Sequence, residues 1–228
     1  MREVVLDTET TGFDPATGDR IVEIGCVELI DHLPTGKNFQ AYLNPERPVP
    51  IETTKVHGLT DEFLADKPLF AHIVEELLEF LGDAPLVIHN ASFDMKFVNS
   101  ELHRVGRKPL HHARAIDTIE IAKAKIPGAR YSLDELCKRF GIDLSARTKH
   151  GALLDAELTA RVYLELVGGR QTHLKLAPVD GVAVVEEAGA IARVRPRPLL
   201  SLVSDAEREA HAGFVEKELG DSPLWRRN

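Results

Sequence analysis

The spacing of apolar residues changes near position 70, and this change limits the possible fold more than any other feature of the sequence. Before it, three strand-like segments at residues 3–8, 20–30 and 37–43 follow one another closely, which favours an antiparallel meander. After it, apolar residues recur every three or four positions, as in the helix predicted for 70–81. Strands first, then alternating strands and helices, predict an α/β domain with a mixed sheet flanked by helices.

The rest of the chain is divided between the second half of this domain and a tail. Further strands are predicted at 85–89 and 115–117, and further helices at 92–105, 132–140 and 151–167. Residues 1–169 therefore make up the predicted domain. The tail is predicted to contain a proline-interrupted linker at 170–203 and a terminal segment at 204–228, which begins with a short amphipathic helix.

Composition sets two further expectations. The chain contains no run of about 18 apolar residues, so no membrane-spanning helix is expected. Acids at Glu3 and Asp7 argue against a secretory signal, and we therefore expect a cytoplasmic protein. Cys26 and Cys137 are too few for a disulfide framework, and both are expected to be reduced residues of the core.

Four acidic residues occupy positions that the surrounding pattern buries. Asp7 and Glu9 close an apolar strand, and a spacing of two places both carboxylates on one face. Asp94 lies in the first turn of one predicted helix and Asp155 near the start of another, each three residues before an apolar position on the same face. A favourable interaction with the helix dipole is a simpler explanation for either of these two acids taken alone.

Taken together, the four acids predict a cation site. Buried like charges cannot all ionise unless a positive group lies among them, and the pattern indicates no matching inward Lys or Arg. Carboxylates without cysteines suit hard cations such as Mg²⁺ or Mn²⁺ rather than Zn²⁺, and such ions favour phosphoryl chemistry. His150 lies five residues before Asp155, in the loop that leads into the helix, and its unperturbed pKa of about 6.5 suits a general base.

Three short motifs resemble those of the DnaQ-like 3′–5′ exonucleases, the family of the proofreading subunits of bacterial DNA polymerase III. They are Asp7-Thr8-Glu9-Thr10, His89-Asn90-Ala91-Ser92-Phe93-Asp94 and His150-Gly151-Ala152-Leu153-Leu154-Asp155-Ala156. The third motif, in which His150 stands five residues before Asp155, is similar to that of the histidine-type (DEDDh) subclass. The segment Val56-His57-Gly58-Leu59-Thr60-Asp61 also resembles the family's substrate-side loop, and the resemblance covers residues 3–167.

This resemblance implies a ribonuclease H-like fold and the removal of nucleotides from the 3′ end of DNA. It further implies that two Mg²⁺ or Mn²⁺ ions are held by Asp7, Glu9, Asp94 and Asp155, and that His150 is the catalytic base. Substrate contacts are expected from Thr8, Thr10, His57, Asn90 and Phe93. Two alternatives remain, namely a stand-alone exonuclease for RNA or short oligonucleotides and an inactive nuclease fold used as an adaptor.

The net charge of −8 opposes DNA binding, because Lys and Arg contacts to phosphate supply most non-specific affinity. Bound cations, or tethering to a partner that holds DNA, would compensate. In the family, the tail attaches to the catalytic alpha subunit of polymerase III. The resemblance therefore implies that the terminal segment docks there through the apolar anchors Phe214, Leu224 and Trp225.

The sequence bears on two further partners, a sliding clamp and a small accessory subunit. Gln171, Leu174 and Leu176 resemble the anchors of a peptide that binds the sliding clamp, for which an ordinary linker is the alternative. The sequence leaves open whether a small accessory subunit binds the nuclease domain.

Overall fold

The computed structural model describes residues 1–145, 147, 149–168 and 204–218. The chain divides into two compact units, residues 1–175 and 176–228. The first contains every element up to α7, and the second contains helix α8, Asp205–Glu218. The predicted linker at 170–203 lies outside the described residues, so the proposed domain boundaries stay predictions.

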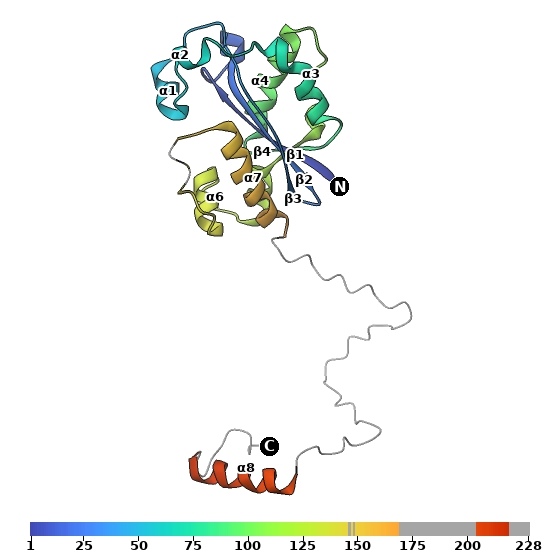
Figure 1. The fold of residues 1–228 in the computed structure, drawn as a ribbon, viewed down its shortest axis with the longest axis vertical. Coiled ribbons are helices and arrows are strands. Elements are labelled where there is room, and N and C mark those ends of the chain that lie inside the picture. Colours follow the sequence, from blue (N-terminus) through green and yellow to red (C-terminus); the bar gives the residue numbers. More distant parts are fainter. Residues whose placement is uncertain (146, 148, 169–203, 219–228) are drawn as a thin grey trace, which may run out of the picture. The chain divides into compact units, whose positions relative to one another are not determined.

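The first unit is built on a five-stranded mixed sheet of order β3-β2-β1-β4-β5 (Figure 1). The strands are β1 (Arg2–Thr10), β2 (Ile21–Ile30), β3 (Leu33–Tyr42), β4 (Leu86–Ile88) and β5 (Ala115–Asp117). The first three pair antiparallel, as the predicted meander requires, whereas β4 and β5 add in parallel beside β1. The prediction of an α/β domain with a mixed sheet is confirmed, and β1 is its central strand.

Helices precede, connect and follow the short parallel strands. They are α1 (Ile51–His57), α2 (Asp61–Leu64), α3 (Phe70–Leu81), α4 (Ala91–Arg104), α5 (Thr118–Lys125), α6 (Leu133–Phe140) and α7 (Ala152–Val167), with single 3₁₀ turns η1 (Pro15–Thr17) and η2 (His112–Arg114). The four helices predicted for this unit are confirmed. Helices α1, α2 and α5 were not predicted, because they are short and bury too few residues to show an apolar stripe.

The two faces of the sheet are covered by different helices. Val4 and Leu6 point into a core built with α3 and α4, whereas Val5, between them, points into a core built with α7. Gly25 allows α7 to approach β2 closely, because a Cβ at this position would lie 2.2 Å from the backbone nitrogen of Leu153. The first turn of α7 therefore packs directly against the sheet.

Two expectations from composition concern the state of the cysteines and membrane-spanning helices. Cys26 and Cys137 are both buried and unpaired, as expected for core thiols. No helix within the described part of the chain has the length and apolar character needed to cross a membrane.

Candidate active site

The fold brings the four predicted acids to one place. Asp7 and Glu9 lie in the last half of β1, Asp94 lies in the first turn of α4, and Asp155 lies in the first turn of α7. Helix α4 follows β4, the parallel neighbour of β1, and α7 packs across β1 and β2. Residues separated by almost 150 positions therefore share one site at the end of the central strand.

Burial makes this concentration of carboxylates costly. The residues Glu9, Asp94 and Asp155 are 9%, 3% and 3% exposed. Burial, reinforced by the surrounding carboxylates, raises the pKa of Asp7 well above its ordinary value and that of Glu9 to about 8. Burial also raises the pKa of Asp94, against the opposing effect of a 2.7 Å hydrogen bond donated by Thr8 Oγ1. The site therefore favours any group that brings positive charge.

One such group is the guanidinium of Arg147, although the sequence pattern predicted no inward basic residue. The side chain of Arg147 is 8% exposed, and its Nε and Nη2 donate to the two oxygens of Asp155 at 2.6 and 2.7 Å. Its Nη1 pairs with Asp134 at the start of α6. The expectation was wrong because Arg147 lies in the loop before α7, where no periodicity indicates which way a side chain points.

His150 lies beside the acids, as the motif led us to expect. Its ring Nδ1 is 3.3 Å from Asp155 Oδ2, and one ligand atom each of Glu9, His150 and Asp155 lie within 4.8 Å of one another. The side chain is 47% exposed, so it has room to turn. Its backbone nitrogen donates to Val56 O at 3.2 Å, which anchors the loop before α7 to α1.

Two further carboxylates hold the helices that carry the site. Glu23, opposite Glu9 in the β1–β2 register, accepts a hydrogen bond from the backbone nitrogen of Ala152 at 3.1 Å and so fixes the start of α7. Asp117 accepts from the backbone nitrogens of Ala91 at 2.9 Å and Ile119 at 2.8 Å, fixing the starts of α4 and α5. The sequence did carry a signal for the role of Glu23, because it is an acidic residue inside the largely apolar strand 21–30.

Three of the five predicted substrate residues make hydrogen bonds within the protein. Thr8 donates to Asp94, and Thr10 Oγ1 donates to Gly12 O at 2.6 Å. His57 is 6% exposed, and its Nδ1 accepts from the backbone of Leu59, so in the neutral ring the proton is on Nε2. Within the described residues this Nε2 has no hydrogen-bond partner.

The other two predicted substrate residues stand at the start of α4. Asn90 is exposed and adopts a left-handed conformation with φ of 71°, whereas Phe93 is half-buried and packs on Phe97 with ring centroids 4.9 Å apart. The substrate roles of all five residues stay predictions.

The predicted partner residues lie in or near the tail. Phe214 is 57% exposed on α8, as an anchor for a partner would need to be. The others, namely Gln171, Leu174, Leu176, Leu224 and Trp225, lie outside the described residues. Partner contacts therefore stay predictions.

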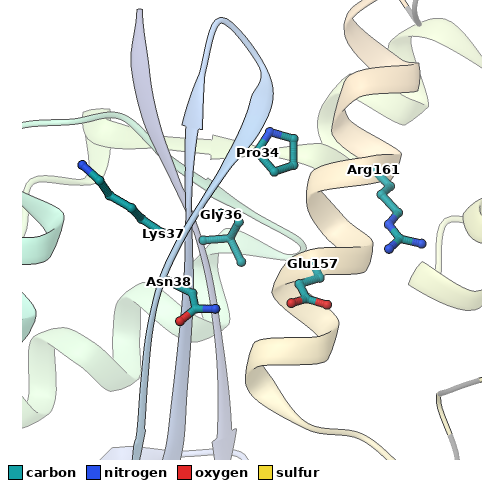
Figure 2. Close-up of a pocket in the computed structure, with 7 residues that line it drawn as sticks. Pro34, Gly36, Lys37, Asn38, Glu157 and Arg161 are labelled. Atoms are coloured by element: carbon teal, nitrogen blue, oxygen red, sulfur yellow. The ribbon is translucent and has the colours of Figure 1, made fainter.

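A separate pocket lies between β3 and α7 (Figure 2). Its lining includes Asn38 from β3 and Glu157 and Arg161 from α7, and none of the four predicted metal ligands is part of it. Glu157 therefore points away from the acids, as expected from its position two residues after Asp155.

A mixed sheet with four acids gathered at the end of its central strand defines a nuclease of the ribonuclease H-like class. Residues 4–163 match the family model described as Exonuclease. The DNA polymerase III subunit epsilon of Rickettsia prowazekii is 54% identical over 226 residues, which cover 96% of this chain and 97% of the relative. The subunit of the same name from Escherichia coli K12 is 41% identical over 238 residues, covering 99% and 97%. The chain belongs to the exonuclease family, in the group of DNA polymerase III epsilon subunits.

A solved structure supports the same fold. The nuclease domain of 3′hExo, a DEDDh family member bound to rAMP, superposes with a TM-score of 0.63 at 21% identity, covering 73% of this chain and 91% of the other.

Proposed function

We propose that this protein is a metal-dependent exonuclease that removes nucleotides from the 3′ end of DNA and proofreads for a replicative DNA polymerase. The observation that carries the proposal is the convergence of Asp7, Glu9, Asp94 and Asp155 beside His150 in a chain of the epsilon group. Every acid of the family motif is present, which argues against an inactive adaptor.

The residues present fit divalent metal ions. The four carboxylates offer the oxygen donors that Mg²⁺ and Mn²⁺ prefer, and the raised pKa values of Asp7 and Glu9 reflect a need for positive charge. We propose that these acids hold two such ions. Bound there, the ions would keep the carboxylates ionised and stabilise negative charge on the phosphate under attack.

The remaining chemistry belongs to residues of the chain. His150 is proposed to take the proton of the attacking water, for which its exposed side chain and its position beside Asp155 are suited. The other residues near the site position these groups, with Glu23 holding the first turn of α7 and Asp117 holding that of α4.

The proposed partners follow from the group to which the chain belongs. We propose that residues 204–228 dock on the alpha subunit of polymerase III and that residues 171–176 bind the sliding clamp, in the cytoplasm. Support comes from the relatives' name, which is that of a polymerase subunit, and from exposed Phe214 on α8. Deleting residues 171–228 should leave nuclease activity intact and abolish co-elution with the alpha subunit. Co-elution of the truncated protein would contradict the proposed docking.

The central experiment follows the shortening of 5′-labelled single-stranded DNA and RNA of the same sequence. Each is incubated with Mg²⁺, with chelator, and with the Asp155→Ala variant. A DNA ladder that shortens from the 3′ end, requires metal and is lost in the variant is the expected result. A strong preference for RNA would favour a stand-alone RNA exonuclease, and no cleavage of either substrate would favour an adaptor.

A further inference from the structure

The guanidinium of Arg147 engages two groups that the proposed reaction needs. Its Nε and Nη2 donate to both carboxylate oxygens of Asp155 in a side-on pair, at 2.6 and 2.7 Å. The same Nη2 lies 2.9 Å from Nδ1 of His150. A third nitrogen, Nη1, pairs with Asp134. One side chain thus connects a proposed metal ligand, the proposed base and helix α6.

The donor chemistry of arginine fixes the roles in these contacts. A guanidinium only donates, so Nδ1 of His150 must be the acceptor, and the lone pair on this nitrogen is used by Arg147. The proton of a neutral ring is then on Nε2. In this arrangement, neither Asp155 nor Nδ1 of His150 is fully available to another cation or to a water proton.

The guanidinium also lies against the side chains between which a metal ion would be held. The ligand atoms of Glu9, His150 and Asp155 lie within 4.8 Å of one another, and Arg147 contacts two of these three residues at less than 3 Å. A divalent cation bound by Glu9 and Asp155 would lie next to a unit positive charge in a mostly buried site. Repulsion between like charges is strong where water is largely excluded.

We propose that Arg147 is an internal counter-cation, which a divalent metal ion displaces from Asp155 and His150. This inference rests on the metal site proposed above. Asp134 offers a place for the released side chain, because it already accepts from Nη1 and its own side chain is 47% exposed. Arg147 can therefore pivot about Asp134 while it leaves Asp155. Displacement then frees the base and the metal ligand in one movement.

Displacement can be observed directly in the wild-type protein by following arginine Nε–H signals by NMR during a Mg²⁺ titration. The Nε–H of Arg147 should be protected from exchange without Mg²⁺ and should lose that protection as Mg²⁺ binds. Arg20 is a matched internal control, since its Nε donates at 2.6 Å to the buried Glu101, which is not one of the four acids of the site. If the Arg147 signal stays protected when Mg²⁺ saturates the site, Arg147 orients Asp155 permanently and the proposal is wrong.

The second measurement is Mn²⁺ affinity by calorimetry at constant ionic strength. Arg147→Gln should bind Mn²⁺ at least about tenfold more tightly than wild type, because the competing charge is removed. Arg139→Gln makes the same change in net charge at an exposed position of α6 and should match wild type. Unchanged or weaker binding by Arg147→Gln would overturn the competition, whereas a wild type that binds no Mn²⁺ would overturn the metal site itself.

Discussion

Replacing Glu9 with glutamine should stabilise the protein at alkaline pH when divalent cations are removed. Burial and neighbouring carboxylates raise the pKa of Glu9 from 4.5 to about 8. Below pH 4.5 this group is protonated in both the folded and the unfolded chain, so it contributes nothing to the pH dependence of stability. Between pH 4.5 and 8 the unfolded chain releases the proton and the folded protein retains it. The free energy of unfolding therefore falls as pH rises through this window.

The magnitude follows from the size of the shift. Each unit is worth about 1.4 kcal/mol, so the carboxylate of Glu9 costs the folded protein at most about 5 kcal/mol above pH 8. Relaxation around the site reduces this figure, and a gain of about 2–4 kcal/mol is expected for Glu9→Gln at pH 8.5. At about 2–4 °C per kcal/mol for a domain of this size, Tm should rise by roughly 5–15 °C.

The assay is thermal unfolding in chelator from pH 5 to pH 9 for wild type, Glu9→Gln and Glu157→Gln. Glu157 is a matched control, because it is a half-buried acid on α7 that lies away from the site. The increase in Tm of Glu9→Gln over wild type should grow with pH, whereas the Tm of Glu157→Gln should change with pH as that of wild type does. Adding Mg²⁺ should cancel or reverse the advantage. A difference in Tm between Glu9→Gln and wild type that does not change with pH would refute the reasoning.

Three further substitutions test the site and its support. Asp155→Ala should abolish cleavage while circular dichroism stays unchanged, and turnover within tenfold of wild type would contradict the proposed ligand set. His150→Gln should keep its affinity for Mn²⁺ and lower kcat by about 10²–10⁴-fold, so unchanged kinetics would remove the assignment as base. Gly25→Ala should lower the free energy of unfolding by more than about 1 kcal/mol in urea, because a Cβ would overlap the backbone of α7; an unchanged midpoint would mean that α7 can shift.

The convergence of the acids could be predicted because each one interrupts a strong pattern. Asp7 and Glu9 end an apolar strand, and Asp94 and Asp155 precede apolar stripes at helical spacing. These patterns report which side of an element faces the core, so an acid on that side must be buried. The structure buries Glu9, Asp94 and Asp155 and leaves Asp7 half-buried beside them.

Elements without a buried face could not be located in the same way. The edge strand β3 begins at Leu33, four residues earlier than predicted, because its first residues are exposed and include Pro34 and Gly36. The turn before it places Asp31 and His32 at φ of 50° and 69°, a conformation that tight hairpins usually obtain from Asn or Gly. Asp31 is a common turn residue, but it is followed by His32 rather than by Gly or Asn, so the sequence lacks the usual two-residue hairpin signal and the start of the hairpin was missed.

Arg147 shows a different limit of sequence reasoning. A basic residue in a polar loop is normally solvated, and no spacing rule connects it to Asp155 eight residues later. Its burial depends on Asp134 at the start of α6 and on the first turn of α7, two helices that pack on each other. Such a contact is a property of tertiary packing.

The charges around the site also explain how an acidic protein can act on phosphate. Arg147 brings a single positive charge to the cluster, which leaves Asp7, Glu9 and Asp94 with carboxyl groups that burial and mutual repulsion keep from ionising readily. A DNA phosphate would meet the same repulsion, so cation binding should precede the approach of the 3′ end. The cost of gathering these acids is a weaker fold in the absence of metal, and the same free energy becomes affinity for the metal once it binds.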